Sequence, residues 1–249
     1  MAAVALGLAV LGGCAASPAA DEAAGSPATL TVYAAASLQA AFDEIADDFE
    51  TAHPEIDILP LVYDGSSTLA TQIVEGASPD VFASADEANM RAVQDAGLGD
   101  PATVFATNTL VIAVPEGNPA GIMSLPDLSD PGATVVLCAP EVPCGHASAQ
   151  LLERAGVDLT PASLEQSVTA VATKVAVGEA DAGLIYTTDV ATRSGIEAIT
   201  PQGADAVVNR YPIAALAGSR HPEAAQAFVD FVTGPEGRDV LARYGFGAP

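Results

Sequence analysis

Basic residues are scarce in this chain of 249 residues. Its 8 lysines and arginines stand against 32 aspartates and glutamates, which gives a formal net charge of −24 at pH 7. A surface this acidic repels nucleic acid and anionic lipid at long range, and we expect no nucleic-acid partner. Apolar residues make up 50 % of the chain. That is enough for a sizeable core, so the charge does not imply disorder of the whole chain.

The sequence also lacks the motifs of covalent catalysis. It contains no G-x-S-x-G, and its one lysine, Lys174, follows Val171 by three positions, so that S-x-x-K is absent. No histidine lies close in sequence to the two serines discussed below, and a nucleophilic serine needs a base. These absences make a secreted serine hydrolase the less favoured alternative to a binding protein without enzymatic activity or cofactor.

The apolar run at residues 1–13 is too short to span a bilayer but has the length of a signal peptide. It ends in Leu11-Gly12-Gly13-Cys14, which resembles the lipobox of bacterial lipoproteins, where the cysteine becomes the lipidated first residue. We expect a signal peptide over 1–13 and a lipidated, flexible tether over 14–28, which is rich in Ala, Ser, Pro, Gly and acids. An ordinary secretory signal with an incidental Cys14 is the alternative.

Beyond residue 28, apolar runs with the length of strands alternate with segments of helical periodicity. Strands are predicted at 30–33, 56–63, 81–83, 109–114, 134–138, 183–186, 196–200 and 211–216. The alternation predicts an α/β protein with a largely parallel sheet and right-handed crossovers. In such sheets, ligands bind beyond the carboxyl ends of the strands.

Two serines lie where predicted strands pass into predicted helices. Ser37 follows Tyr33-Ala-Ala-Ala, and Ser66 follows Gly65 in a segment with three consecutive hydroxyl residues. A helix N-terminus offers free N–H groups and a positive dipole end, which suits an anion. Each serine alone is better explained as a helix N-cap. Together, in consecutive strand–helix units, they could converge on one anion.

Four motifs carry a resemblance to a known family. They are Ala-Ala-Ala-Ser-Leu at 34–38, Ser-Ser-Thr-Leu-Ala-x-Gln-Ile-x-x-Gly-Ala at 66–77, Asp-Val-Phe-Ala-Ser-Ala-Asp at 80–86 and Arg-Tyr-Gly-Phe at 243–246. The chain from about Thr29 onward resembles the periplasmic molybdate-binding proteins of ABC importers. The resemblance implies a type II periplasmic-binding-protein fold. Its two α/β lobes, each a mixed, mostly parallel sheet flanked by helices, are joined by a hinge of crossing strands. We assign 29–108 and 212–249 to lobe 1 and 109–211 to lobe 2, with crossing points near Asn108 and Tyr211.

The resemblance also implies the ligand-binding residues. Ser37 and Ser66 match serines that contact the oxyanion, Cys144 and Val168 match backbone N–H donors, and Tyr186 matches a tyrosine that donates its O–H. Ser67 is adjacent to Ser66 and ranks lower. The ligand would be molybdate or tungstate, held by uncharged donors alone.

The family often has alanine where this chain has Cys144, and Cys138 lies six positions before it. Outside the cytoplasm, two cysteines this close favour a disulfide, with a pair of free thiols as the alternative. Cys138, Cys144 and His146 are metal ligands by type, but no fourth Cys or His lies nearby in sequence, and we expect no metal site.

The remaining expectations follow from the family. The protein would be a monomer outside the cytoplasm, attached by lipid to the outer face of the bacterial membrane or periplasmic, and would deliver its anion to an ABC permease. A binder of another solute, such as sulfate or ferric iron, is the main alternative. Iron-binding relatives use adjacent tyrosines, whereas the tyrosines here are residues 33, 63, 186, 211 and 244.

Overall fold

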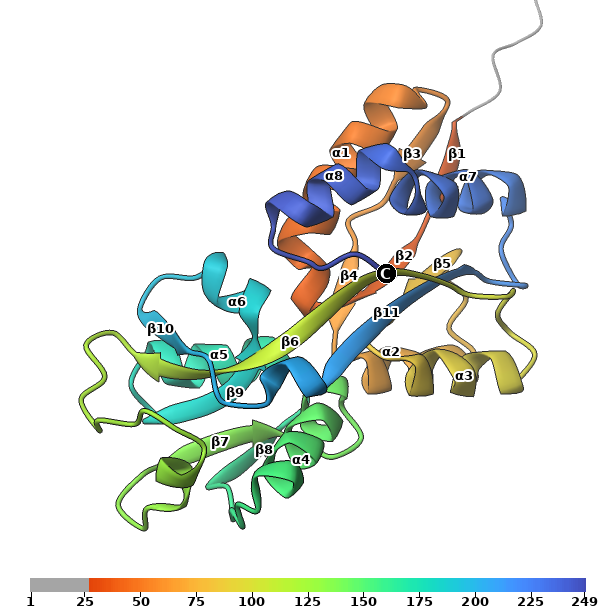
Figure 1. Cartoon of the computed structure of the whole chain (residues 1–249). Coiled ribbons are helices and arrows are strands. Elements are labelled where there is room, and N and C mark those ends of the chain that lie inside the picture. The colour runs from red at the N-terminus through yellow and green to blue at the C-terminus, as the bar shows by residue number, and fades with distance from the viewer. Residues whose placement is uncertain (1–26) are drawn as a thin grey trace, which may run out of the picture.

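The computed structural model describes residues 27–249. The expected signal peptide at 1–13, the expected lipidation site at Cys14 and nearly all of the expected tether at 14–28 lie outside these residues. None of the helices within 27–249 combines the length and the apolar character that crossing a bilayer requires. The described chain folds into two lobes joined by two neighbouring strands (Figure 1).

The first lobe contains the N-terminal and C-terminal parts of the described chain. Its own strands are β1 (Ala28–Leu30), β2 (Val32–Ala35), β3 (Ile56–Ile58), β4 (Val62–Asp64) and β5 (Val81–Ala83). Its helices are the 3-10 helix η1 (Ala36–Leu38), α1 (Gln39–Ala52), α2 (Ser66–Val74), α3 (Glu87–Asp95), α7 (Pro222–Thr233) and α8 (Pro235–Arg243). Strands β4, β2 and β5 are neighbours and run parallel to one another.

The second lobe is built from the middle of the chain. Its own strands are β7 (Val135–Cys138), β8 (Ser163–Glu165), β9 (Ala182–Tyr186) and β10 (Ile196–Ile199). Its helices are α4 (Pro143–Ala155), α5 (Val168–Ala176) and α6 (Thr187–Ala191), with the 3-10 helices η2 (Pro126–Ser129) and η3 (Ala204–Ala206). Strands β9, β7 and β8 are parallel neighbours, as in the sheet of the first lobe.

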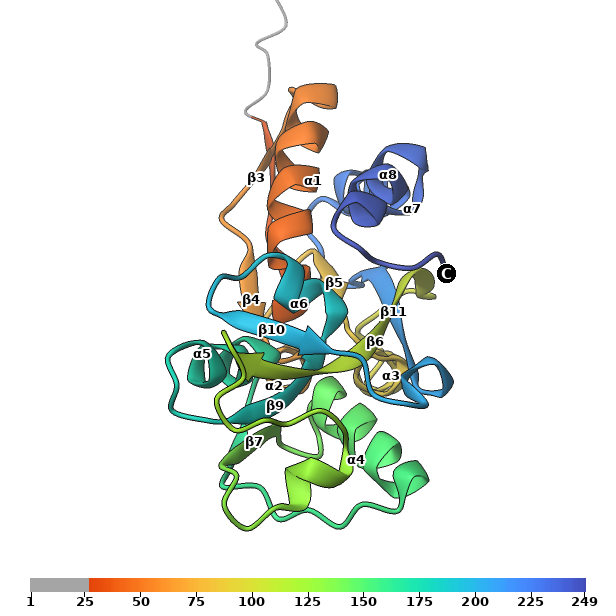
Figure 2. The ribbon, with the colours of Figure 1, turned by 60° about the vertical axis from the view of Figure 1, so that its left-hand side comes forward.

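Strands β6 (Thr103–Pro115) and β11 (Val208–Ala215) connect the lobes and lie side by side (Figure 2). Residues 103–109 of β6 pair with β11, and from Leu110 onward β6 pairs with β9 instead. These pairings are antiparallel, as is that of β10 with β6. Each lobe therefore has a mixed sheet, in which the lobe's own neighbouring strands run parallel and the connecting strands β6 and β11 add antiparallel pairings. The sequence predicted only the second half of β6.

The predicted strand over 56–63 is two strands with different partners. β3 pairs with β1, while β4 pairs with β2. Pro60 lies between them and has no N–H to donate to a ladder, which explains why the strand breaks there. β4 ends at Asp64, and the next residue is Gly65. β4 therefore brings the chain to the edge of the sheet where the predicted site lies.

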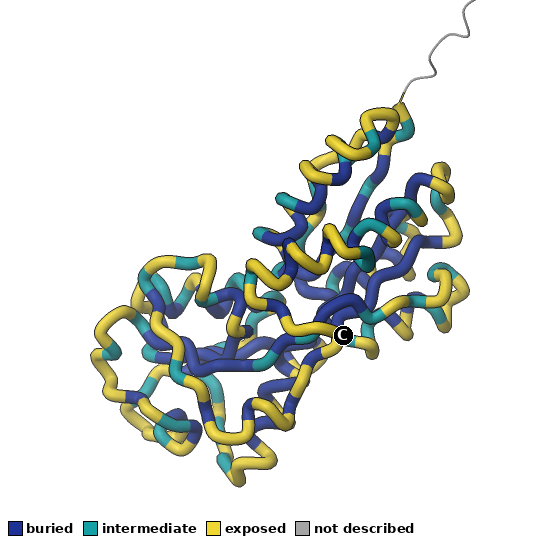
Figure 3. Tube along the Cα trace, turned by 45° about the horizontal axis from the view of Figure 1, so that its top comes forward, coloured by how far each residue is buried: buried dark blue, intermediate teal, exposed yellow. Residues whose placement is uncertain are grey.

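Buried residues run through the strands of both lobes, and the outer faces of the helices are exposed (Figure 3). In α1, Phe42, Ile45 and Phe49 are fully buried, and their spacing places them on one face of the helix. Tyr211 of β11 is buried as well, and its ring contacts Phe105 and Phe246 edge to face. Aromatic packing thus fixes β11 against the first lobe.

Candidate functional site

A small, partly open cavity lies where the two lobes meet. Its lining consists of Ala35, Ala36, Ser37, Gly65, Ser66, Ala85, Val142, Pro143, Cys144, Val168 and Tyr186. None of these side chains carries a charge at neutral pH. Ser37, Ser66, Cys144, Val168 and Tyr186, which the sequence singled out, all contribute to this wall, whereas Ser67 does not.

Several helices begin at the cavity wall. α2 begins at Ser66, α5 begins at Val168, and Cys144 is the second residue of α4. The first N–H groups of a helix have no partner within it, and neither α2 nor α4 has a side-chain cap that would occupy them. The first turns of these helices therefore direct free donors and positive dipole ends to one small volume.

Neither serine is the helix cap that the sequence favoured for each one alone. Ser37 lies inside η1, and its Oγ is 3.0 Å from the Tyr211 hydroxyl. Ser66 is the first residue of α2 rather than its N-cap, which is Gly65, and its Oγ accepts the Ala85 N–H at 3.0 Å. Both hydroxyls are bonded to groups outside their own helices and reach the cavity wall.

Tyr186 ends β9 and is buried, with its ring 5.9 Å from that of Tyr211. Its hydroxyl accepts a hydrogen bond of 2.9 Å from the Asn209 amide, and the same amide nitrogen donates to the Ala85 carbonyl at 3.0 Å. Burial raises the pKa of Tyr186 well above its usual value, and Tyr211 and Asp86 act in the same direction. The phenol therefore keeps its proton and remains a donor at any physiological pH.

A disulfide joins Cys138, the last residue of β7, to Cys144 in the first turn of α4, and the two Cα atoms are 5.7 Å apart. The disulfide links the first turn of α4, which contains the Cys144 N–H, to the end of β7. The chain is packed tightly here, because a Cβ atom on Gly145 would overlap the Ala139 carbonyl. His146 is exposed, and no group of three metal-ligating side chains occurs within residues 27–249.

The lobes touch each other beside the cavity. Gly65 of the first lobe lies directly against the carbonyl of Gln166 in the second lobe, and a Cβ atom at position 65 would overlap that oxygen. On α3, the Asn89 amide donates a long hydrogen bond of 3.4 Å to the Glu141 carbonyl of the second lobe. Both contacts join segments next to the cavity, so the two lobes touch directly beside it.

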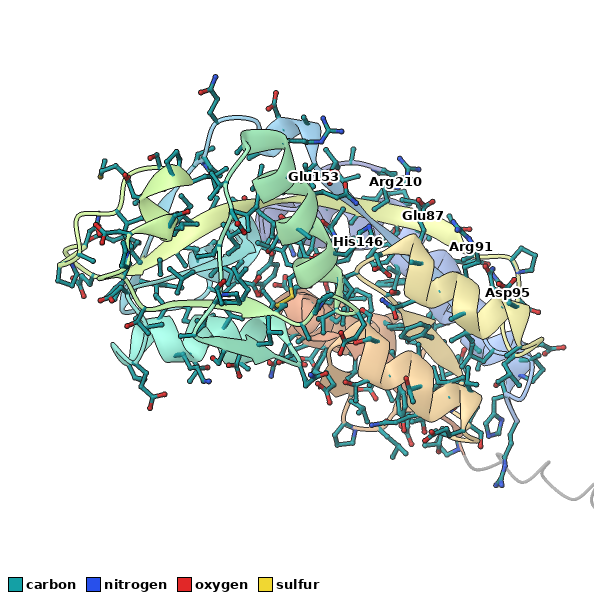
Figure 4. All side chains as sticks on the ribbon, turned by 90° about the horizontal axis from the view of Figure 1, so that it is seen from below. Glu87, Arg91, Asp95, His146, Glu153 and Arg210 are labelled. Atoms are coloured by element: carbon teal, nitrogen blue, oxygen red, sulfur yellow. A yellow bond between two sulfur atoms is a disulfide. The ribbon has the colours of Figure 1, made fainter. Side chains whose placement is uncertain are left out.

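Charged side chains gather on the outer surface near the cavity. Figure 4 shows Glu87 and Arg91 on α3, His146 on α4 and Arg210 on β11, all of which line an open polar groove between these elements. The Arg210 guanidinium is 3.7 Å from the Glu87 carboxylate, and both side chains are about half exposed. Such an exposed pair contributes little to stability. The cavity wall itself remains uncharged.

The sequence did not assign Asn209, Ala85 or the close approach at Gly65 to the site, and it named Tyr211 only as a crossing point between the lobes. Asn209 and Tyr211 lie in a strand that was predicted only from its apolar part, and Tyr211 meets Ser37 across 174 positions. One signal was present, because Asn209 and Asn108 are buried amides in the two connecting strands and lie directly opposite each other. Buried polar side chains are almost always hydrogen-bonded, so two asparagines in these strands indicate hydrogen-bond partners elsewhere in the fold.

The fold is that of the type II periplasmic binding proteins, two lobes with a small cavity between them. The family model described as bacterial extracellular solute-binding protein matches residues 30–247. The chain belongs to this family of extracellular solute-binding proteins.

Individual proteins resemble this chain in sequence or in structure. The molybdate-binding protein ModA of Mycobacterium tuberculosis H37Rv is 46% identical over 226 residues, which cover 89% of this chain and 85% of that protein. Among solved structures, the periplasmic molybdate-binding protein of Azotobacter vinelandii has a TM-score of 0.76 at 20% identity and covers 88% of this chain and 99% of its own. The sulfate-binding protein SubI of M. tuberculosis has a TM-score of 0.70 at 20% identity, covering 88% and 86%.

Proposed function

We propose that this protein captures molybdate, and with it tungstate, between its lobes and delivers the anion to an ABC permease. The observation that carries the proposal is the cavity lined from both lobes by neutral hydrogen-bond donors and by no charged side chain. The 46% identity to a molybdate-binding protein over most of both chains supports the same ligand. Ser37, Ser66 and Tyr186 would donate through hydroxyls, and Cys144 and Val168 through backbone N–H groups.

The donor chemistry distinguishes between anions. Molybdate and tungstate are dianions without hydrogens at neutral pH, and a cavity of donors satisfies them. Phosphate near neutrality usually carries a hydrogen, which would be buried without an acceptor and would reduce affinity. Sulfate also has no hydrogen, so only the size of the cavity separates it from molybdate. Neutral donors suffice for a dianion because each of these hydrogen bonds is assisted by the ligand's charge.

We further propose that capture is a closure of the lobes about β6 and β11. In this proposal residues 29–108 and 212–249 move as one lobe and 109–211 as the other. A ligand that contacts both lobes favours their closed arrangement, which the permease would then recognise. The protein would act as a monomer without catalytic activity, held at the outer face of the bacterial membrane by a lipid on Cys14.

Calorimetric titration with molybdate, tungstate, sulfate and phosphate tests the proposal. We expect tight binding of molybdate and tungstate, weaker binding of sulfate and no measurable binding of phosphate. Equal affinity for sulfate and molybdate would contradict the proposed selectivity and would favour a general binder of acceptor-only dianions. An ester hydrolysis assay on the same sample, with the Ser37→Ala variant, tests the hydrolase alternative, for which we expect no activity.

A further inference from the structure

Asn209 determines whether the Tyr186 hydroxyl donates or accepts a hydrogen bond. The Ala85 carbonyl can only accept, so the group that faces it at 3.0 Å must be the amide nitrogen of Asn209. That same nitrogen is 2.9 Å from the Tyr186 Oη, so its second hydrogen is given to the phenol. The orientation of the Asn209 amide is therefore set by its partners, and the Tyr186 oxygen acts as the acceptor.

A phenol that accepts through its oxygen still has its own hydrogen to donate. Tyr186 is buried, and beside it lies the Tyr211 hydroxyl, which contacts Ser37 and also interacts with the Tyr186 hydroxyl. Tyr186 also lines the cavity, where a bound anion would offer that hydrogen a charged acceptor, which is stronger than the neutral Tyr211 hydroxyl. Asn209 occupies the oxygen from behind and so leaves the Tyr186 hydrogen for the ligand.

The Ala85 peptide extends the same arrangement to Ser66. Its carbonyl holds Asn209, and its N–H donates to the Ser66 Oγ at 3.0 Å. The Ser66 hydroxyl, which is also buried, thus accepts from the protein and has its hydrogen free. The backbone N–H and carbonyl of Ala85, just beyond the end of β5, thus leave two cavity hydroxyls as donors, Ser66 directly and Tyr186 through Asn209.

We propose that Asn209 is a specificity-determining positioning residue. It does not line the cavity, but it makes Tyr186 a donor and thereby restricts the site to oxyanions without hydrogens. This inference rests on the proposed function, because it deepens the role of the same cavity. Without the Asn209 N–H, the phenol could turn its oxygen to the ligand and accept a hydrogen, so protonated anions such as phosphate would be excluded less strictly.

A double-mutant cycle separates this role from general stabilisation. Asn209→Leu should weaken molybdate binding roughly tenfold, the scale of one hydrogen bond to a charged group. In the Tyr186→Phe background the same substitution should change affinity little, because Asn209 acts through the phenol. Asn108→Leu is the matched control, since Asn108 lies opposite Asn209, is equally buried and donates to Thr188 at 2.8 Å rather than to a cavity hydroxyl.

Asn209→Asp is a second variant that keeps the size of the side chain, in case the leucine variant does not fold. An ionised carboxylate accepts the Tyr186 hydrogen, so molybdate affinity should fall further than in Asn209→Leu, and the ratio of phosphate to molybdate affinity should rise. Equal losses from Asn209→Leu in both backgrounds, or unchanged selectivity in folded Asn209→Asp, would overturn the inference.

The wild-type titration distinguishes failure of the inference from failure of the proposed function. If wild type prefers sulfate to molybdate, the proposed function fails, and the same cycle is measured with sulfate, which is also an acceptor-only dianion. If wild type prefers phosphate near neutral pH, or binds none of the four anions, the donor-only site itself is wrong and the inference falls with it.

Discussion

The Gly65 backbone packs directly against the carbonyl oxygen of Gln166, which belongs to the other lobe. The backbone angles of Gly65, φ −58° and ψ 135°, are open to any residue, so glycine is not needed there for its conformational freedom. What requires glycine is the contact between the lobes. The missing side chain is thus a condition for the lobes to come together beside the cavity.

Gly65→Ala should therefore weaken molybdate binding by tenfold or more while leaving the fold intact. The added methyl group overlaps the Gln166 carbonyl only when the lobes are together, and the substitution also stabilises slightly by restricting the unfolded chain. Calorimetry measures the affinity, and small-angle scattering measures whether molybdate still compacts the protein. Gly218→Ala is the control, because a Cβ atom at that exposed site meets nothing within 4 Å. Unchanged affinity in Gly65→Ala would show that ligand binding does not need this contact.

Removal of the cavity hydroxyls should reduce affinity one at a time. Ser37→Ala, Ser66→Ala and Tyr186→Phe should each weaken molybdate binding by about 1–3 kcal/mol, the scale of a hydrogen bond to a charged group. Ser67→Ala is the matched control, since the Ser67 Oγ is buried without a partner within residues 27–249 and does not line the cavity. We expect its affinity to equal that of wild type. If none of the first three variants binds more weakly, the ligand binds elsewhere.

Loss of the disulfide should affect stability more than binding. Replacing Cys138 and Cys144 together by serine removes a short cross-link, which should lower the free energy of unfolding by roughly 2 kcal/mol. Affinity should change little by comparison, because the proposed donor at Cys144 is its backbone N–H. Denaturant unfolding of wild type with and without reductant gives the first quantity, and titration of the double variant gives the second. A collapse of affinity in a folded double variant would mean that the cross-link itself shapes the site.

The stability of the protein should depend on pH through Asp189. Its carboxylate is buried in α6 and accepts the Tyr186 N–H at 3.1 Å, and burial raises its pKa to about 7 from 3.8, against the lowering effects of that N–H and of Arg193. The folded state therefore binds the proton more tightly than the unfolded state. The contribution of Asp189 to the free energy of unfolding is therefore largest below about pH 4. It falls as the pH rises from 4 to 7, by up to roughly 4 kcal/mol in all, and does not change further above pH 7.

Unfolding free energies of wild type and Asp189→Asn between pH 4 and 8 measure this dependence. The amide oxygen of the variant can still accept the Tyr186 N–H, so the variant should lose the pH-dependent fall that Asp189 causes and be relatively more stable at pH 8. Glu197→Gln is the control, because Glu197 also accepts a backbone N–H, that of Gly117, but is exposed. Parallel pH curves for wild type and Asp189→Asn would contradict the raised pKa.

Local sequence patterns predicted the parts of the site that depend on local structure. The strand–helix junctions at Ser37 and Ser66 follow from apolar runs and helical spacing, and the family motifs added the residues of the second lobe. The contacts behind the cavity could not be found this way. Ser37 meets Tyr211, and Tyr186 meets Asn209, only because β11 returns to lie beside β6. Such pairings between distant segments are set by packing of the whole sheet, which no local window of sequence contains.

The same limit applies to the connecting strands. Residues 103–108 of β6 read Thr-Val-Phe-Ala-Thr-Asn, and their apolar stretch of three residues gave a weaker signal than the continuous apolar run after Thr109. Their strand structure depends on the partner strand, and Asn209 lies in that partner strand. The predicted single strand over 56–63 was wrong for a local reason. Pro60 interrupts the apolar run and has no N–H to donate to a neighbouring strand.

The lining of the cavity has one more consequence, for how this protein could change its preferred anion. Apart from Ser37, Ser66, Tyr186 and the disulfide-bonded Cys144, the wall is made of alanine, glycine, proline and valine, which have few or no rotamers to adjust. The size of the cavity is therefore set by the positions at which the helices begin. Variants that favour a smaller or larger oxyanion should arise in the packing that supports α2, α4 and α5, at positions that never touch the ligand.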